Sequence, residues 1–247
     1  MKYIVNADDF GRTETVNQAI VEGFKNGCLD RTTIMVNMPF FEQAVQLANE
    51  YGFQNNVGLH LNLTSGIPLT DDIKKCKVFC DDAGRFNGSI FKNHREQFFL
   101  TLQEKKAVRK ELEAQIKKYL DFGFDLMHAD SHGHVHTFPS LCGLVLNVLK
   151  KYNFKSVRIS LNVVNSKFKQ IYKKILNAKL NGFNKRQGKV CLYFAPFKEM
   201  SNISERLHLI DGFSEIMLHP NIYDGSFVIG QALHFPDILQ WKERYKE

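Results

Sequence analysis

Short apolar segments alternate with segments of helical periodicity along the whole of this sequence. The apolar segments have the length and the β-branched content of buried strands, and they lie at residues 2–6, 32–36, 57–61, 126–127, 156–159, 190–194 and 215–218. Most are followed by a stretch with helical spacing, and connections of that kind join parallel strands. The pattern predicts one α/β domain over residues 1–247, a distorted, TIM-barrel-like (β/α) barrel of about seven parallel strands.

The expected helices carry start and stop signals. Thr15 and Gln18 are placed as a capping box for the first helix, and Gly27 follows its end. Pro39 precedes the second helix, and Pro139 opens the helix after the fourth strand. Further helical spacing is present at residues 108–120 and 201–210. These helices are the crossovers that a parallel sheet requires.

Residues 64–93 break the alternation with Gly, Pro, Asp and Lys. A stretch of that length without periodicity inside a compact domain is usually functional, because an irregular surface segment can line or cover a binding site. We therefore predict that it forms a lid or a wall for the substrate and sets specificity.

The formal net charge of +7 is concentrated in one segment. Residues 165–189 contain eight Lys and Arg residues and no acid, so this segment alone accounts for the excess. A nucleic-acid binder would combine such charge with readout residues or stacking aromatics, whereas Phe168, Tyr172, Ile175 and Leu176 have the spacing of an amphipathic helix. We predict a solvated helix over the edge of the barrel and no nucleic-acid partner.

The cysteines and the N-terminus indicate where the protein acts. Five cysteines, an odd number mostly within apolar segments, favour reduced thiols over a disulfide framework. The first residues run directly into an aspartate pair without a signal-peptide pattern, and no apolar run approaches the roughly 20 residues of a membrane span. A cytoplasmic protein that does not cross a membrane is expected.

Acidic and imidazole side chains stand at the carboxyl ends of several predicted strands. Asp8 and Asp9 follow the first strand. His60 ends the third strand, and His219 ends the seventh. Residues 128–136 place four histidines and one aspartate around the end of the fourth. Because parallel strands bring their carboxyl ends to one face, these side chains are expected to converge, although an isolated aspartate pair can be a helix cap and an isolated histidine can belong to the core.

Such a set of side chains has the chemistry of a hydrolase. One carboxylate and two imidazoles can hold a divalent ion and leave positions open for water. A second carboxylate nearby can accept a proton from that water, and a further histidine can protonate a leaving group. These groups suit hydrolysis of an amide or an ester through a tetrahedral intermediate.

Four segments form a recognisable set of motifs, namely NADDFG at 6–11, GLHLNLT at 58–64, DSHGHVH at 130–136 and HP at 219–220. In sequence and order they resemble the signature of the YdjC-like carbohydrate deacetylases, a family that includes chitooligosaccharide deacetylase and hopanoid-associated proteins. The resemblance implies a deacetylase on a distorted (β/α) barrel, with Asp9, His60 and His132 as metal ligands. It also implies that Asp8 is the general base and His219 the general acid.

The same resemblance implies a substrate, a cofactor and an assembly. Members of the family hydrolyse a linear amide bond, removing the N-acetyl group of an N-acetylglucosamine unit, so an acetylated sugar or oligosaccharide is the expected partner. One divalent ion is expected, either Zn²⁺, which suits two histidines and one carboxylate, or Mg²⁺, which prefers oxygen ligands. A homodimer is common in the family.

Other polar residues are assigned supporting roles. Asp130 and His136 are predicted to orient the metal ligands by contacts with their outer side. His136 is also the strongest alternative to His132 as a metal ligand. Arg158, at the end of the fifth strand, is expected either to hold a hydroxyl or carboxylate of the substrate or to form a surface salt bridge. His128 and His134 are predicted either to support the metal ligands in the same way or to be structural.

The residues leave two other functions open. A phosphoesterase would use the same metal-binding residues on a different bond, and a non-catalytic carbohydrate-binding relative would keep the fold without the reaction. The far C-terminus also differs from the family pattern, in which an Arg-Glu-x-Glu-Leu helix follows the last motif. We expect residues 244–247 to begin that helix, with closure of the barrel beside the first strand in question.

Overall fold

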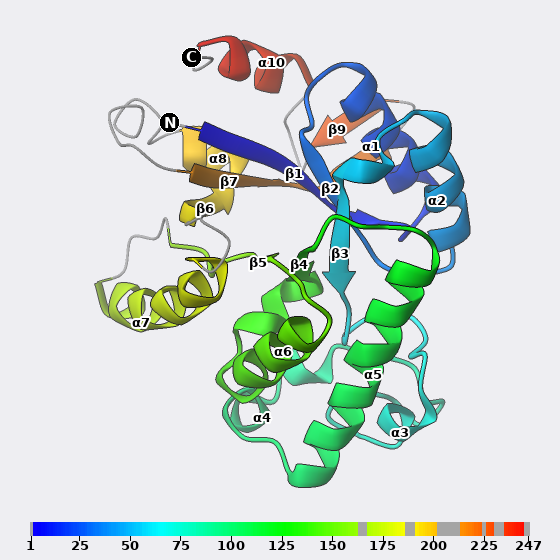
Figure 1. Ribbon diagram of the computed structural model, residues 1–247, viewed down its shortest axis with the longest axis vertical. Helices are drawn as coiled ribbons and strands as arrows, with labels where there is room; N and C mark the ends of the chain where they lie inside the picture. The colour runs from blue at the N-terminus through cyan, green and yellow to red at the C-terminus, as the bar shows by residue number, and fades with distance from the viewer. Residues whose placement is uncertain are drawn as a thin grey trace.

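Seven parallel strands form one sheet in the order β5-β4-β3-β2-β1-β7-β6 (Figure 1). This computed structural model describes residues 2–162, 167–185, 191–201, 213–223, 226–229 and 235–244. The strands are β1 (Lys2–Phe10), β2 (Arg31–Ile34), β3 (Val57–Leu61), β4 (His128–Ser131), β5 (Ser156–Val157), β6 (Cys191–Pro196) and β7 (Phe213–Leu218). The predicted α/β fold with about seven parallel strands is confirmed, and the sheet is curled into a half-barrel.

Helices follow the strands, as parallel connections require. The longer ones are α1 (Glu14–Lys25), α2 (Phe41–Glu50), α5 (Leu102–Asp121), α6 (Pro139–Lys151), α7 (Lys167–Asn184) and α10 (Phe235–Arg244), and α8 (Phe197–Ser201) is short. The prediction of a capping box at Thr15 was wrong, because Thr13, with extended backbone angles, is the N-cap of α1 and accepts from the Val16 N–H. A complete capping box occurs instead at α5, between Thr101 and Glu104.

The segment at residues 64–93, which we call the β3 insertion, is folded and attached to the core. It carries two short elements, α3 (Asp71–Lys74) and η2 (Ser89–Phe91), and α4 (His94–Phe98) follows it. Glu111 of α5 accepts hydrogen bonds from the backbone N–H groups of Leu69 and Thr70 at 3.0 and 2.9 Å. Such anchoring gives the insertion a fixed place beside the carboxyl end of β3.

Two 3₁₀ turns and a hairpin complete the described structure. The turns are η1 (Gln54–Asn56) and η3 (His132–Thr137), and the antiparallel hairpin pairs β8 (Pro220–Tyr223) with β9 (Ser226–Ile229). The hairpin was not predicted. The helix expected to begin at Arg244 starts earlier, because Arg244 belongs to α10, which begins at Phe235, and residues 245–247 lie outside the described residues. The helix expected at residues 201–210 falls mostly outside the described residues.

Side-chain contacts across the sheet show how strongly it curls. β5 and β1 are four places apart in the strand order, yet Arg158, directly after β5, donates to Asp8 in β1 at 2.7 Å. The same guanidinium donates to Glu215 in β7 at 2.7 Å. Strands so distant in the sheet can meet only across its concave side, so the interior of the half-barrel is bridged by charged side chains.

Helix α7 covers the gap that the curl leaves between β5 and β6 (Figure 1). Asn184 binds both the N–H and the carbonyl of Val157 in β5, at 2.8 and 2.9 Å. Asn181, three residues earlier on the same face, binds both backbone groups of Cys191 in β6, at 3.2 and 2.8 Å. Side-chain amides thus take the place of the strand pairing that a closed barrel would supply. β1 is paired with β2 on one side and β7 on the other, so the sheet is continuous beside the first strand.

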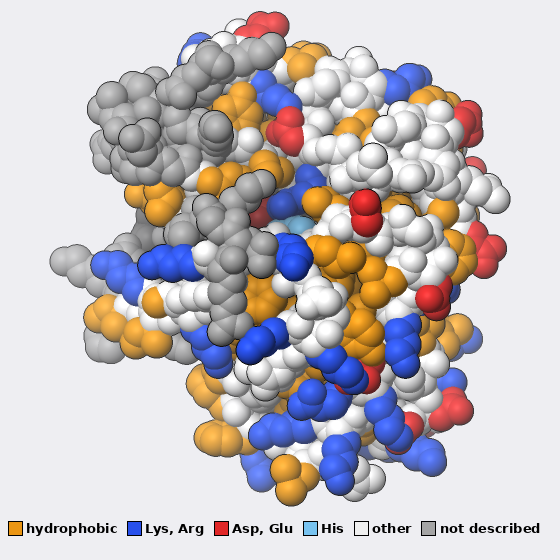
Figure 2. All heavy atoms as spheres, viewed as in Figure 1, with side chains coloured by type: hydrophobic (Ala, Val, Ile, Leu, Met, Phe, Trp, Pro, Cys, Tyr) orange, Lys and Arg blue, Asp and Glu red, His pale blue; other side chains and the backbone are white. Residues whose placement is uncertain are grey.

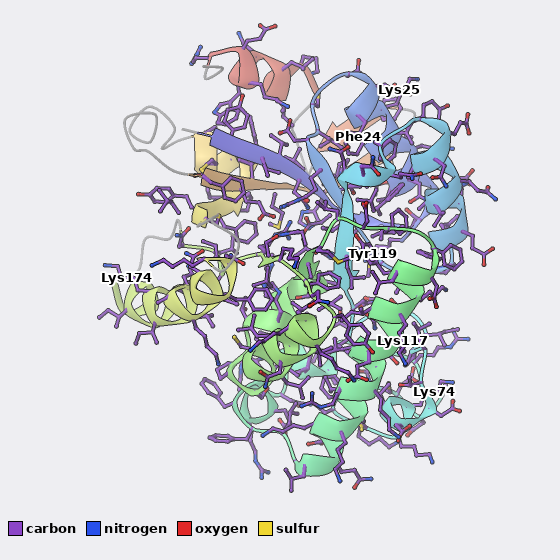
Figure 3. The ribbon with its side chains drawn as sticks, viewed as in Figure 1. Phe24, Lys25, Lys74, Lys117, Tyr119 and Lys174 are labelled. Atoms are coloured by element: carbon purple, nitrogen blue, oxygen red, sulfur yellow. The ribbon has the colours of Figure 1, made fainter. Side chains whose placement is uncertain are left out.

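The predicted helix over the barrel edge is therefore present in α7, with one modification. Leu176 and Leu180 are buried beneath it, whereas Ile175, expected on the buried face, is 70% exposed. Lys174 lies on the exposed side of the helix (Figure 3). Lys and Arg side chains also gather over α5 and α6 on the face shown in Figure 2. None of the helices in the described ranges combines the length and the apolar character needed to span a membrane.

Replacing Asn184 with Ala tests the closure by α7. The substitution leaves two backbone groups of Val157 without partners in a buried place, and we expect a loss of about 2–4 kcal/mol in the free energy of unfolding. Urea denaturation measures this loss. Lys174→Ala, on the solvent side of the same helix, is the control and should change stability by about 0.5 kcal/mol or less. Equal effects of the two substitutions would contradict the role given to Asn184.

Candidate active site

The first strand ends in a bulge that brings two adjacent carboxylates into the interior. The pairing of β1 with β2 shifts register between Ala7 and Phe10, and Asp9 has a φ of 70°, in the left-handed region that residues other than glycine seldom adopt. Neighbours in a regular strand point to opposite faces. Here Asp8 and Asp9 are both buried, at 2% and 4% exposure. The bulge therefore allows both to serve one site.

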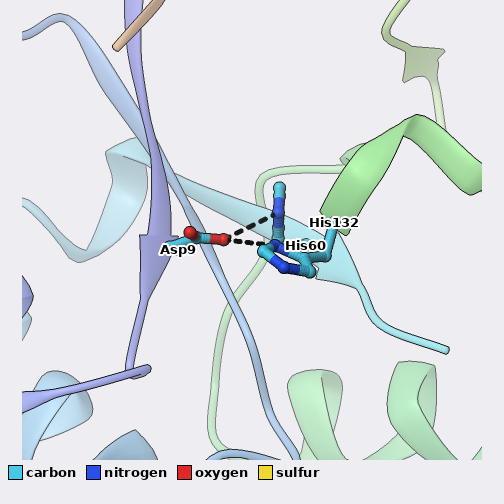
Figure 4. A group of neighbouring side chains, drawn as sticks. All are labelled: Asp9, His60 and His132. Atoms are coloured by element: carbon cyan, nitrogen blue, oxygen red, sulfur yellow. Dashed lines mark hydrogen bonds and ion pairs between the residues drawn. The ribbon is translucent and has the colours of Figure 1, made fainter. Parts of the chain in front are cut away.

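Asp9 meets two imidazoles from distant parts of the chain (Figure 4). Its Oδ1 lies 2.7 Å from Nδ1 of His132 and 3.3 Å from Nε2 of His60. His132 directly follows β4, in a turn where Gly133 has a φ of 60°. The side chain of His132 is 19% exposed, which leaves the group open to solvent on one side. The structure thus brings together the three residues that the sequence assigns as metal ligands.

Asp130 lies behind His60 and fixes the orientation of its ring. Oδ1 of Asp130 is 2.6 Å from Nδ1 of His60, and the hydroxyl of Thr33 is 3.1 Å from the same nitrogen. A carboxylate on one ring nitrogen directs the other, Nε2, toward Asp9. Burial alone would lower the pKa of His60, but Asp130 and the Asp9 carboxylate raise it to about 10. The carboxylates around His60 therefore stabilise positive charge at this position.

Asp8 is held by a fork of hydrogen bonds. Nη1 and Nη2 of Arg158 donate to its two oxygens, each at 2.7 Å, and the Asn6 amide donates to Oδ1 at 2.9 Å. Burial alone would raise the pKa of Asp8, but Arg158 lowers it well below its usual range. Nε2 of His219 lies 3.9 Å from Oδ2 of Asp8, and the side chain of His219 is 51% exposed. An ionised carboxylate and a solvent-accessible imidazole therefore stand side by side.

Arg158 is completely buried, so it does not form the surface salt bridge considered from the sequence. Nε donates to Glu215 and Nη2 lies 2.7 Å from Oδ2 of Asp130, in addition to the contacts with Asp8. Its guanidinium also lies 4.7 Å from the ring centre of Phe194. Each guanidinium nitrogen already faces a carboxylate. The substrate contact proposed for Arg158 stays a prediction, and its position favours orientation of Asp8.

The other three histidines of the cluster have different places. His136 binds Ser131 through Nδ1 at 2.5 Å and the Arg158 carbonyl through Nε2 at 3.0 Å. A role as a rival metal ligand would require one of these nitrogens to face the ion, and neither does. The ring of His134 packs edge-on against Phe194. His128 is the first residue of β4, which begins directly after the predicted strand 126–127, and it lies at the opposite end of the barrel, beside a cavity of about 200 Å³. None of the three joins Asp9.

Three groups of side chains in the described residues have potential ligand atoms within 4.8 Å of one another. The group of Asp8, His60 and Asp130 and the group of His128, Asp130 and Glu215 both contain carboxylates that Arg158 already contacts at 2.7 Å. A cation there would have to approach a guanidinium. Among the described residues, the ion-pair partner of the group of Asp9, His60 and His132 is Arg12, which lies on Oδ2 of Asp9 and has a side chain that is 42% exposed. This third group fits a divalent ion best.

The net charge of the interior leads to the same group. Four carboxylates and two guanidinium groups are buried inside the half-barrel, contributed by Asp8, Asp9, Asp130, Glu215, Arg31 and Arg158. With neutral histidines these six side chains carry two negative charges in excess, and the partly exposed Arg12, 2.8 Å from Asp9, offsets one of them from the rim. Buried charges are costly unless they are balanced, so the excess of carboxylates around Asp9 suits a bound cation.

Comparison with known sequences decides the family. The sequence model of the YdjC-like protein family matches residues 2–247. This chain belongs to the YdjC-like family.

Relatives within the YdjC-like family carry an enzyme name. A carbohydrate deacetylase of Vibrio cholerae is 39% identical over 153 residues, which are 62% of this chain and 57% of the relative. One from Halalkalibacterium halodurans is 30% identical over 248 residues, covering 98% of this chain and 97% of the relative. The chain thus matches little more than half the length of the first of these relatives.

A solved structure supports the fold of this YdjC-like chain. It is a protein from Enterococcus faecalis V583 proposed to be a cellobiose-phosphate cleavage protein. The TM-score is 0.70 at 25% identity, and the match covers 97% of this chain and 84% of the other.

Several residues of the YdjC-like site were not found from the sequence. Glu215 accepts from Arg158 and lies 2.8 Å from Nη2 of Arg31. Thr33 donates to Asp130 at 3.0 Å, and Asn6 donates to Asp8. The available signal was a charged or polar residue within an apolar strand, which is unusual because burial of a charge requires a partner. Glu215 met that description, whereas Arg31 lies just before the predicted strand 32–36 and gave no such signal.

The pH dependence of stability tests the role of Glu215. Burial alone would raise its pKa, but Arg31 and Arg158 lower it to about 2, against about 4.3 in an unfolded chain. The contribution is therefore present above pH 4.3 and lost as the pH falls toward 2. We expect Glu215→Gln to lose about 3–5 kcal/mol at pH 7 and the difference from the wild type to shrink by pH 3. Urea unfolding at both pH values measures it.

Glu113→Gln serves as the control for that measurement. Glu113 forms a surface ion pair with Lys151 at 3.0 Å, and the Lys151 side chain is 59% exposed. Its loss should change stability by about 1 kcal/mol or less. A Glu215→Gln effect that does not change with pH would show that Glu215 is not ionised in the folded protein.

Proposed function

We propose that this protein is a metal-dependent carbohydrate deacetylase that hydrolyses the N-acetyl group of an acetylated sugar, such as an N-acetylglucosamine unit. The observation that carries the proposal is the placement of Asp8, held ionised by Arg158, beside the group of Asp9, His60 and His132. The deacetylase name of relatives that match almost the full chain supports the same reaction. A cytoplasmic location and a homodimer stay predictions.

Asp9, His60 and His132 would hold the cation. A divalent ion bound there supplies Lewis acidity, which polarises a carbonyl and makes water more acidic. Two imidazoles and one carboxylate suit Zn²⁺, while Mg²⁺ would require several additional oxygen ligands. The hydrogen bond between His60 and Asp130 keeps Nε2 of the imidazole available as a ligand.

Asp8 is suited to accept the proton of the attacking water. Its carboxylate is ionised at neutral pH and oriented by the fork of Arg158. The bidentate contact uses one lone pair on each oxygen, so Oδ2 can still accept a hydrogen bond from water. A base that is fixed in this way requires no reorientation during the reaction.

His219 is suited to protonate the departing amine. Its Nε2 stands 3.9 Å from Asp8 on the solvent-accessible side of the site. A protonated imidazole can give a proton to a nitrogen that leaves a tetrahedral intermediate. Asp8 and His219 would thus act as a base and an acid on the same face of the substrate.

Parallel substitutions at the two adjacent aspartates test this division of roles. Asp8→Asn should retain the metal and lose about 10²–10⁴-fold in the rate of acetate release. Asp9→Asn should lose both the metal and the activity. Metal content after dialysis and acetate release from N-acetylglucosamine oligomers are the measurements. Removal of the metal with a chelator should abolish activity in the wild type, and added Zn²⁺ or Mg²⁺ should restore it.

The same assay separates the alternative functions. Full acetate release without a metal would contradict the proposal. Release of phosphate from sugar phosphates in place of acetate would favour a phosphoesterase, and binding of sugars by a protein that hydrolyses neither bond would favour a non-catalytic carbohydrate-binding relative.

A further inference from the structure

Phe91 belongs to the β3 insertion, at a point where that insertion is firmly fixed. Its neighbour Ile90 is completely buried. The Gln97 side-chain amide donates to the carbonyls of Ile90 and Phe91 at 3.0 and 3.1 Å. Ser140 of α6 donates to the Glu96 carbonyl at 2.8 Å. The Phe91 ring is therefore carried by backbone that is attached to the barrel.

The ring rests against the turn that carries His132. A Cβ atom placed on Gly133 would lie 2.2 Å from Cζ of Phe91, closer than two carbon atoms can approach. A Cβ on Gly88 would be 3.5 Å from Cδ2 of the same ring. The ring thus lies between two glycines, one of which directly follows a residue proposed to bind the metal. Phe138 meets it edge-on, with ring centres 6.1 Å apart.

Despite these contacts, Phe91 is 40% exposed. An apolar side chain that is fixed and left open to solvent at the carboxyl end of a barrel is placed where such folds bind their substrates. Exposure alone is not distinctive, because Phe98 and Phe99 are more exposed. The contact with Gly133 is what sets Phe91 apart, since it places the ring next to His132.

We propose that Phe91 is the platform on which the sugar ring of the substrate packs, an inference that rests on the proposed deacetylase function. One face of a pyranose ring presents mainly C–H groups, and the negative face of an aromatic ring attracts such weakly positive hydrogens. Packing there would orient the sugar while its N-acetyl group reaches Asp8. Phe91 is then a determinant of specificity for a pyranose and takes no part in bond breaking.

The test compares Phe91→Ala and Phe91→Leu with the wild type on the β-1,4-linked dimer of N-acetylglucosamine. Loss of the platform should raise KM about tenfold, as expected for an apolar contact of this size, with kcat changed less than about twofold. Phe91→Leu keeps the packing against Gly133 and should show a similar rise, because it lacks the aromatic face. Phe91→Tyr keeps that face and should restore KM. Hydrolysis of 4-nitrophenyl acetate, which has no sugar ring, should be unchanged in all variants.

Phe122→Ala is the matched control. Phe122 is 41% exposed, nearly the same as Phe91, and its ring packs against Phe41 of α2. This substitution should leave KM unchanged. If the wild type is active and both Phe91→Ala and Phe91→Leu have a normal KM, the proposal of a platform is overturned. The proposed deacetylase function would then be unaffected.

Binding measurements keep the two proposals distinguishable. If the wild type releases no acetate, the deacetylase function fails, and calorimetry of the same disaccharide with the metal-loaded protein then tests Phe91 alone. Binding that weakens about tenfold in Phe91→Ala would support the platform. Equal binding by both proteins, or no binding by the wild type, would overturn it.

Discussion

The buried guanidinium of Arg158 is the interaction on which both the shape of the half-barrel and the candidate site depend. It contacts Asp8 of β1, Asp130 of β4 and Glu215 of β7 at 2.7 Å, and so joins strands that are distant in the sheet order. Removing one member of a buried ion pair costs about 3–5 kcal/mol, because the remaining charge is left uncompensated. The sheet is therefore held in its curl by the same contacts that orient the proposed base.

A second constraint lies in the backbone at Asp9. Two adjacent residues of one strand must serve the same site, although the pleat would send them to opposite faces. The bulge and the left-handed φ of 70° resolve that conflict, at a cost of about 1–3 kcal/mol for such a conformation. The contacts of Asp8 with Arg158 and of Asp9 with His132 hold the bulge in place. The strained backbone conformation of Asp9 and the side-chain contacts at the candidate site therefore depend on each other.

The sequence was sufficient to predict that Asp8, Asp9, His60 and His132 lie close together, because each lies at or just beyond the carboxyl end of a strand and parallel strands align those ends. It was insufficient for Glu215, since a charged residue inside a strand shows neither which face it takes nor what it meets across the curl. The asparagines of α7 were missed for a similar reason. In the sequence Asn181 and Asn184 look like ordinary polar residues of a basic helix, and only the gap between β5 and β6 gives their amides a function.

The low pKa of Asp8 also constrains how the site can work. Arg158 makes this carboxylate a weak base, whereas ordinary water, with a pKa of about 15.7, is a very weak acid. Transfer of a proton between them would be uphill by more than about ten pKa units, and each unit corresponds to about 1.4 kcal/mol. Such a base becomes effective only where water is made far more acidic, with a pKa of about 7 beside a catalytic zinc ion. A cation held by Asp9, His60 and His132 would supply that acidity, so the two adjacent aspartates would have interdependent roles in the proposed reaction.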